Sequence, residues 1–187
     1  MPMRFRRDRC PSPIGGILMI SDDDGNVRAL DFEDYESRMH QLLRLQWGDY
    51  ALSEGPAPAT AKQAIEAYFE GELDRLATVP IRMGGTAFQR DVWDALRAIP
   101  AGTTTSYGRL AANLGRPKAS RAVGMANGSN PIAIVVPCHR VIGSDGSLTG
   151  YGGGLPRKQW LIRHEREWSD GATAGFVPGT VVAGQIA

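Results

Sequence analysis

The sequence predicts a mixed α/β (α+β) protein whose first part carries a β-sheet and whose second part is mostly helical. Three observations support this prediction. Two apolar runs flank a turn between residues 14 and 35, which is the pattern of a β-hairpin. From Thr86 onward, apolar residues repeat at helical spacing. Two short helical stretches joined by a tight turn then indicate a helix-turn-helix.

The hairpin consists of "GGILMI" and "VRALDF", because the "SDDDGN" between them holds the Asp, Gly and Asn residues that favour turns. "SEGPAPAT", residues 53–60, is typical of a linker or loop. A helix is predicted after it, since Ala61, Ile65, Tyr68 and Phe69 repeat at helical spacing and Gly71 can end it.

The helices of the second part begin at a capping box. Thr86 and Gln89 stand at the spacing at which each side chain satisfies a free backbone donor of the other. The first helix of the helix-turn-helix is "YGRLAANLG", which Ser106 can cap and Gly115 can end. The second is "ASRAVGMANGS". The apolar stripe after the capping box consists of Phe88, Val92, Leu96 and Ile99.

A last helix is predicted in "PRKQWLIRHEREW", with a proline near its start. Beyond Trp168 the chain has no helical period and is rich in glycine and small residues. We therefore expect a mobile tail. The predicted organisation is an N-terminal α/β domain over residues 1–82, a second domain over 83–168 and the tail over 169–187.

The composition is that of an ordinary globular protein, with 42% apolar and 22% charged residues among 187. No apolar stretch is long enough to span a bilayer, and the basic N-terminus lacks the apolar segment of a secretory signal. A cytoplasmic protein is expected, in which a disulfide between Cys10 and Cys138 is disfavoured. Since the two cysteines and three histidines lack zinc-site spacing, no metal is expected.

The charge is unevenly spread along the chain. Residues 1–82 hold 10 basic and 14 acidic side chains, whereas residues 83–187 hold 11 and 6. A positive segment of this kind fits a polyanionic partner. On charge alone, a solvated basic face is an equal alternative.

The second helix of the helix-turn-helix consists almost entirely of small residues. Long polar side chains usually read base edges, and only Arg121 is of that kind. A smooth helix in a basic segment favours close approach to a narrow groove and sequence-independent binding. The alternative is a helix packed inside its own domain. The small residues are Ala119, Ser120, Ala122, Gly124, Ala126, Gly128 and Ser129.

Cys138 lies in "NPIAIVVPCHRVIG", the stretch of the chain with the most reactive chemistry. A free cysteine is most often a small buried apolar residue. Here the apolar run predicts a strand that Pro137 ends, so that the thiol is presented where a buried segment emerges. His139 and Arg140 follow directly, and such neighbours favour the thiolate, which is the nucleophilic form.

Glu165 is the carboxylate that could help to activate this cysteine. Leu161, Glu165 and Trp168 stand at i, i+4 and i+7, which places Glu165 on the side of the last helix that should be buried. A buried glutamate needs a partner. His139 would be one, since a carboxylate orients an imidazole that activates a thiol. Pairing with Arg163 or Arg140 is the alternative.

The loop "GSDGSLTGYGGG" follows the cysteine, and six of its twelve residues are glycine. Such a loop can bring backbone groups close to a flat ligand, although it could equally be a plain hairpin connection. Tyr151 lies within it and could line a pocket.

Several segments together resemble the bacterial O6-alkylguanine-DNA alkyltransferases (methylated-DNA–protein-cysteine methyltransferases), the Ogt type in particular. They are "GGTAFQRDVW", "SYGRLA", "SRAVGMANGSNP", "PCHRVIG" and "GYGGGLPRKQWLIRHE". The resemblance is dense from about Met83 to Trp168 and weaker over residues 10–82. It implies an N-terminal ribonuclease-H-like domain with an antiparallel sheet. It also implies a mostly helical, winged-helix-like C-terminal domain that binds double-stranded DNA in the minor groove.

The resemblance also implies roles for individual residues. Cys138 would take the alkyl group from O6-alkylguanine, and from O4-alkylthymine, in one irreversible turnover without a cofactor. His139 would be a water-mediated base that Glu165 orients. Tyr107 would donate toward guanine N3, and Arg121 would occupy the space of the flipped nucleotide. Asn130 would organise the turn before the cysteine.

The same resemblance places further residues at the DNA and at the base. Ser120, Ala122, Gly124 and Ala126 would contact DNA. Val141, Tyr151, Gly152, Gly153 and Met125 would line the base and alkyl pocket, and Gly152 to Gly154 would leave it roomy enough for bulky alkyl groups. A monomer is expected in solution, with cooperative assembly on DNA as an option. The rival hypotheses are a cysteine hydrolase and a non-catalytic DNA-binding module.

Overall fold

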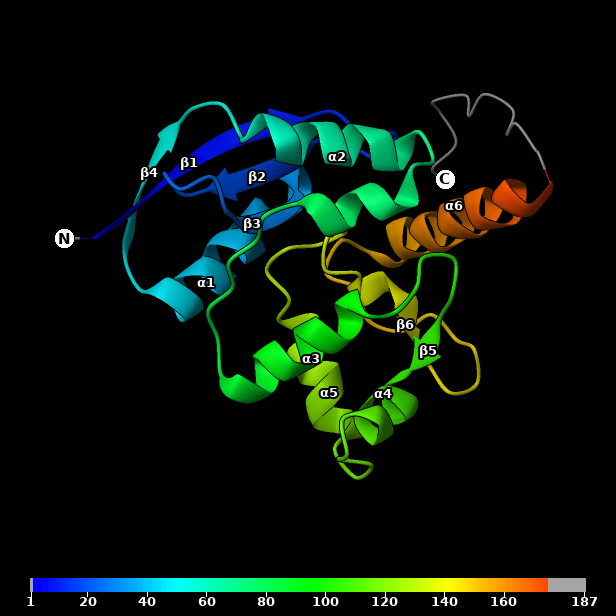
Figure 1. Cartoon of the computed structure of the whole chain (residues 1–187). Helices are drawn as coiled ribbons and strands as arrows, with labels where there is room; N and C mark the ends of the chain where they lie inside the picture. Colours follow the sequence, from blue (N-terminus) through cyan, green and yellow to red (C-terminus); the bar gives the residue numbers. More distant parts are fainter. Residues whose placement is uncertain (1, 175–187) are drawn as a thin grey trace.

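The computed structural model describes residues 2–174 and sets a four-stranded sheet against a group of helices (Figure 1). The strand order is β3-β2-β1-β4. The predicted hairpin is confirmed, because β2 and β3 pair antiparallel, as do β1 and β2. The strands are β1 (Met3–Cys10), β2 (Ile17–Ser21), β3 (Val27–Phe32) and β4 (Tyr50–Glu54).

One edge of the sheet departs from the antiparallel arrangement that the sequence predicts. β4 runs parallel to β1. A parallel neighbour needs a crossover connection, which the 3₁₀ helix η1 (Glu33–Tyr35) and helix α1 (Glu36–Trp47) supply between β3 and β4. β1 is not apparent from the sequence, because four arginines interrupt any apolar alternation in "MRFRRDRC".

Helices cover both faces of this sheet, so β2 and β3 are buried along their whole length. On one face, Met39 and Leu43 of α1 pack against Leu18 and Ile20. On the other face lies α2 (Ala59–Phe69), the helix predicted after the proline-rich loop, which continues into the 3₁₀ helix η2 (Leu73–Thr78). Figure 1 shows α2 lying along the sheet on the side away from α1.

The helix-turn-helix and the helix before it follow the local signals in the sequence. The capping box is present: the Gln89 backbone N–H donates to Thr86 Oγ1 over 3.2 Å, and the Thr86 N–H donates to Gln89 Oε1 over 2.9 Å. Ser106 caps the first short helix, and Gly115 follows its end with a positive φ of 70°. The helices are α3 (Ala87–Arg97), α4 (Tyr107–Asn113) and α5 (Ser120–Gly128).

The last helix, α6 (Leu155–Ala174), is longer than predicted. Helical structure does not end at Trp168, because Ser169 packs beside Gly102 and its hydroxyl donates to the Ala101 carbonyl over 3.4 Å. The remainder of the predicted tail, residues 175–187, lies outside the described residues.

The two parts of the chain share one apolar core. Leu30 and Tyr68 from the first part and Trp93, Val136 and Leu161 from the second belong to the same buried cluster. The backbone joins them as well: the Leu30 N–H donates to the Pro131 carbonyl over 3.0 Å, and the Ala133 N–H donates to the Leu30 carbonyl over 2.9 Å. Strand β3 therefore anchors the segment that leads to Cys138. Within residues 2–174, no helix is both long and apolar enough to cross a membrane.

Candidate active site

The segment before Cys138 forms a buried turn, so the prediction of a strand is wrong. Among residues 2–174, this segment makes a single β-bridge, from Ile132 to Leu30, after which the Val136 N–H donates back to the Ile132 carbonyl over 3.0 Å. Asn130 holds the turn from inside: its Nδ2 donates to the Val136 carbonyl over 2.8 Å, and its Oδ1 accepts from the Ile132 N–H over 3.0 Å. The Asn130 side chain thus makes hydrogen bonds that a neighbouring strand would otherwise make. Ile134 is left-handed, with φ 69°, which is unusual for a β-branched residue.

Cys138 begins the 3₁₀ turn η3 (Cys138–Arg140), directly before the short strand β6 (Val141–Ile142), which pairs in parallel with β5 (Thr105–Ser106). Its side chain is almost fully buried. Burial raises the pKa of the Cys138 thiol, and a hydrogen bond from the Asn130 side chain opposes that rise. Burial therefore disfavours the thiolate, and a base near Cys138 would help to form it.

Glu165 is buried, as its helical position predicts, and His139 is one of its partners. His139 Nε2 lies 2.7 Å from Glu165 Oε1, and both side chains are buried. The alternative partner is present too, since Arg140 Nε and Nη2 each donate to the carboxylate over 2.9 Å. Arg163 pairs instead with Glu167.

The Glu165 carboxylate is held in its charged form. Burial alone would raise its pKa, but His139 and Arg140 more than offset this effect and bring the pKa far below its usual range. The Tyr68 hydroxyl and the Gly102 N–H donate to the carboxylate as well, over 2.9 and 3.2 Å. An anionic Glu165 accepts a hydrogen bond from His139 Nε2. His139 Nδ1 is buried and has no hydrogen-bond partner among the described residues, so it is the ring nitrogen that remains available.

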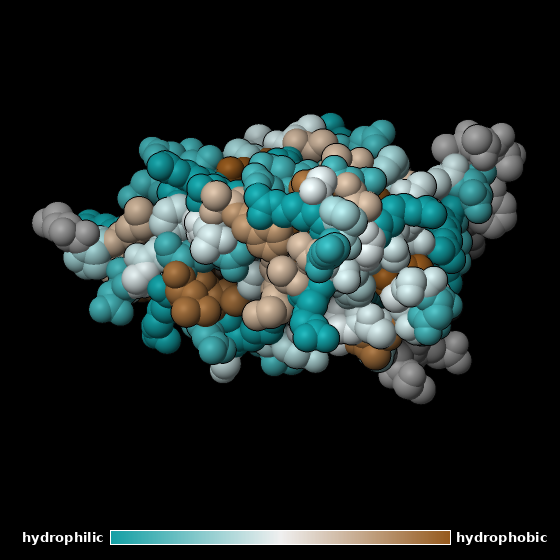
Figure 2. All heavy atoms as spheres, turned by 90° about the horizontal axis from the view of Figure 1, so that it is seen from below, coloured by the Kyte–Doolittle hydropathy of each residue, from teal (hydrophilic) through white to brown (hydrophobic). Residues whose placement is uncertain are grey.

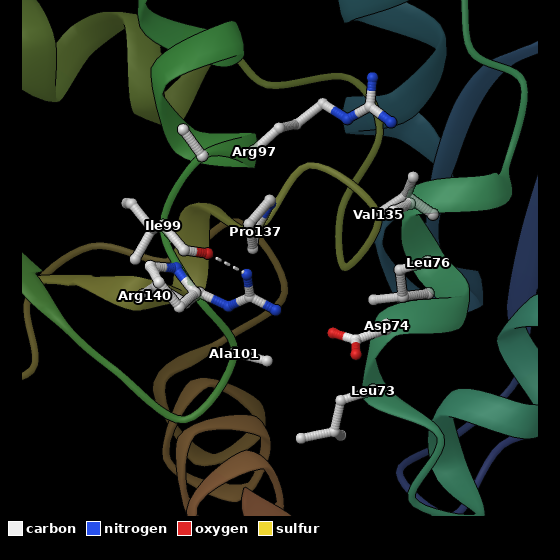
Figure 3. A pocket seen from close by; sticks show the side chains of 12 residues that line it. Leu73, Asp74, Leu76, Arg97, Ile99, Ala101, Val135, Pro137 and Arg140 are labelled. Atoms are coloured by element: carbon white, nitrogen blue, oxygen red, sulfur yellow. Dashed lines mark hydrogen bonds between the residues drawn. The ribbon is translucent and has the colours of Figure 1, made fainter.

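Arg140 also faces a cleft behind the cysteine turn (Figure 3). The cleft has a volume of about 250 Å³ and lies between η2 and the α3–β5 connection. In Figure 3, Asp74 points from η2 toward the Arg140 guanidinium, which donates to the Ile99 carbonyl over 2.5 Å. Arg140 therefore ties Glu165 to the loop that ends α3.

The glycine-rich loop, residues 143–154, lies close to the cysteine. The Tyr107 hydroxyl at the start of α4 donates to the Thr149 carbonyl over 3.1 Å, and burial raises the pKa of Tyr107. Within the part of the chain that the structure describes, the Tyr151 hydroxyl is buried without a hydrogen-bond partner, and Val141 is fully buried beside the cysteine turn.

Side chains from the N-terminal part of the chain stand against the backbone at Gly152 and Gly153. A Cβ at Gly152 would stand 2.3 Å from the Arg38 guanidinium carbon, and one at Gly153 would stand 2.7 Å from the Phe32 ring. These glycines therefore allow neighbouring side chains to approach the loop closely.

On α5 the structure contradicts one predicted DNA contact, Ala126 (Figure 2 views the side of the molecule that carries α3, α4 and α5). Arg121, Ala122, Met125 and Gly128 are exposed, while Ser120 and Gly124 are half-buried. Ala126 is buried, and its carbonyl accepts from Trp93 Nε1 over 2.9 Å, because the helical twist turns it inward with Val123. Met125, which is expected to line the pocket, is 74% exposed.

Two residues near the cysteine are not part of the predicted site. Arg38 of α1 donates to Asp31 over 2.6 Å and to the Gly128 carbonyl over 2.7 Å. No local pattern marks it, since its contacts lie far along the chain. Lys158 is fully buried on α6. It stands three residues before Leu161, on the apolar face, which is the same signal that reveals Glu165. Among the described residues, no group of His, Cys, Asp and Glu could hold a metal ion.

A thiol buried beside a His–Glu pair, next to a helix-turn-helix with one exposed face of small residues, defines a class: a DNA-binding protein with a cysteine equipped for group transfer. Comparison with known families agrees with this class. The ribonuclease-like domain of 6-O-methylguanine DNA methyltransferase matches residues 8–83, and the DNA-binding domain of the same family matches residues 87–167. The chain belongs to this family of DNA-repair alkyltransferases.

Individual relatives are similar over most of their length. The methylated-DNA–protein-cysteine methyltransferase of Salmonella typhimurium is 48% identical over 165 residues, which cover 87% of this chain and 96% of that protein. The one from Mycolicibacterium paratuberculosis is 48% identical over 168 residues, covering 88% and 94%. The activity of this chain is therefore that of a methylated-DNA–protein-cysteine methyltransferase.

Solved structures agree in fold. Mycobacterium tuberculosis OGT, crystallised in complex with DNA, is 41% identical, with a TM-score of 0.73 over 88% of this chain and 94% of that one. The O6-methylguanine-DNA methyltransferase of Pyrococcus kodakaraensis is 27% identical, with a TM-score of 0.68 over 86% and 98%. The predicted fold class, a ribonuclease-like α/β part followed by a helical DNA-binding part, is confirmed. DNA is the partner.

Proposed function

We propose that Cys138 takes the alkyl group from O6-alkylguanine in duplex DNA, once per molecule. The observation that carries this proposal is the unpaired Nδ1 of His139, which the Nε2 contact with Glu165 leaves free as a base. Nδ1 removes the thiol proton through an intervening water, and the anionic Glu165 stabilises the imidazolium that results.

The transfer itself is a displacement at the alkyl carbon. The Cys138 sulfur forms a bond to that carbon, the carbon–O6 bond breaks, and its electron pair stays on the guanine. The departing base becomes neutral by gaining one proton, which the Tyr107 hydroxyl donates toward N3 and recovers from the protonated His139 through solvent. Thiol and alkylguanine thus become thioether and guanine. Because a thioether does not leave again, the reaction stops after one turnover.

DNA binding follows from the exposed face of α5. Arg121 and the small residues Ala122 and Gly128 form a surface that fits the minor groove without reading its sequence. The target nucleotide must leave the duplex to reach a cysteine that is only 6% exposed, and Arg121 takes its place in the stack. O4-alkylthymine presents a similar leaving group and belongs to the same proposal.

The remaining parts of the proposal concern organisation. Residues 1–82 support the turn that holds Cys138, and residues 83–168 bind DNA and carry out the transfer. We expect a cytoplasmic monomer that can assemble cooperatively on DNA.

A duplex with a single O6-methylguanine that carries a labelled methyl group tests this function. Label is expected on Cys138 at no more than one per chain, and none is expected on a Cys138→Ala variant. Cys10→Ala is the matched control, since Cys10 is equally buried but lies at the end of β1. Several turnovers per chain would favour a cysteine hydrolase, and binding without any label on the protein would favour a non-catalytic DNA-binding module.

A further inference from the structure

Lys158 is a buried cation that the mechanism above does not use. Its side chain on α6 is fully buried, and its Nζ donates to three backbone carbonyls: Val141 over 2.6 Å, Thr149 over 2.9 Å and Gly150 over 3.4 Å. Within the described part of the chain, no carboxylate lies within ion-pair distance of this ammonium. An ammonium in such a place is costly, because burial favours the neutral amine and lowers the pKa of Lys158.

The three carbonyls belong to two segments beside Cys138 whose relative position shapes the site. Val141 begins β6, directly after the cysteine turn, while Thr149 and Gly150 lie in the glycine-rich loop. The Thr149 carbonyl also accepts the hydroxyl of Tyr107. Lys158 therefore joins the loop to β6 from the same helix that carries Glu165.

The charge of Lys158 also acts on Cys138, where it opposes the effect of burial on the thiol pKa. Other charges near the cysteine compensate each other: Arg38 favours the thiolate, but its guanidinium is paired with Asp31, which disfavours it. Lys158 is the cation near Cys138 that has no anionic counterpart in the described structure. The titratable and charged groups that face Cys138 are Asp31 on β3, Arg38 on α1, Tyr107 on α4, His139 on η3, Tyr151 on the loop and Lys158 on α6.

We propose that Lys158 is a positioning residue for alkyl transfer, which clamps the glycine-rich loop to β6 and stabilises the Cys138 thiolate with its uncompensated charge. The effect of Lys158 on alkyl transfer rests on the proposed function. The effect of Lys158 on the Cys138 thiol is a property of the free protein.

Two variants separate the clamp from the charge. Lys158→Met removes both, whereas Lys158→Gln keeps an amide that can donate to the carbonyls but is neutral. Lys62→Met is the matched control, because it removes the same charge far from the site, where Lys62 pairs with Asp8. Circular dichroism establishes that each variant is folded, and the Gln variant decides the question if the Met variant does not fold.

The first measurement is the rate at which iodoacetamide alkylates Cys138, followed by mass spectrometry of its peptide as a function of pH. Loss of a nearby cation should move the midpoint of this profile upward by about one pH unit in both Lys158 variants, and not in Lys62→Met. Hydrogen exchange over residues 143–154 should rise in Lys158→Met and remain closer to the parent protein in Lys158→Gln.

The second measurement is single-turnover transfer from the O6-methylguanine duplex. A one-unit rise in the thiol pKa leaves about tenfold less thiolate at pH 7, so transfer should slow about tenfold and recover at higher pH. An unchanged alkylation midpoint in both variants, or a rate that falls equally at every pH, overturns the proposal. If the parent protein does not transfer label at all, the proposed function fails, while the iodoacetamide profile still tests Lys158.

Discussion

Replacing Glu165 by Gln keeps the shape of the buried side chain but removes the negative charge that five donors share. These donors are the Tyr68 hydroxyl, the Gly102 N–H, His139 Nε2 and two Arg140 nitrogens. The amide nitrogen of a glutamine repels donors instead of accepting from them. Arg140, which is 6% exposed, then loses the one carboxylate within ion-pair distance among the described residues.

The size of the effect follows from burial. An exposed ion pair contributes about 0–1 kcal/mol, whereas removal of one partner from a buried pair costs about 3–5 kcal/mol. Glu165 is 1% exposed, so the larger value applies. Glu167→Gln is the matched control, because Glu167 lies on the exposed side of the same helix, 3.8 Å from Arg163, and its loss should change the free energy of unfolding by less than about 0.5 kcal/mol.

The pH dependence gives a second, independent readout. The pKa of Glu165 lies far below its unfolded value of about 4.3, so its stabilisation is present above that pH and is lost as the pH falls toward the folded pKa. The difference in unfolding free energy between the parent protein and Glu165→Gln should therefore shrink between pH 7 and pH 3. Urea unfolding at a series of pH values measures it. A Glu165→Gln variant as stable at pH 7 as Glu167→Gln would refute the reasoning.

Three further substitutions test the rest of the site. Tyr107→Phe removes a proton donor and should slow single-turnover transfer by about 10²–10³-fold, with little loss of duplex affinity in fluorescence anisotropy; an equal loss of both would argue against a role in proton donation. Asn130→Ala leaves a buried carbonyl and a buried N–H unpaired and should cost about 2–4 kcal/mol in urea unfolding, whereas Asn113→Ala at the end of α4 should cost far less. Gly152→Ala places a methyl group against the Arg38 guanidinium and should lower the melting temperature; an unchanged melting temperature would mean that Arg38 moves aside freely.

The parts of this protein that the sequence alone determines are those decided by neighbours along the chain. The capping box of Thr86 and Gln89, the β2–β3 hairpin and the short helices each depend on hydrogen bonds that span a few residues, so their residue types stand at fixed spacings. The position of Glu165 on a buried helical face belongs to the same class, since helical periodicity alone marks a charge that must find a partner.

Only the tertiary structure decides how those local pieces meet. The apolar run before Cys138 has the composition of a strand, but the Asn130 side chain supplies its hydrogen bonds and turns it. Arg140 and His139 both reach Glu165, and the backbone carbonyls that hold Lys158 come from segments that only the fold brings together. The physical reason is that a buried charge pairs with groups that are close in space. These groups can be far apart along the chain, where no periodic pattern in the sequence reveals them.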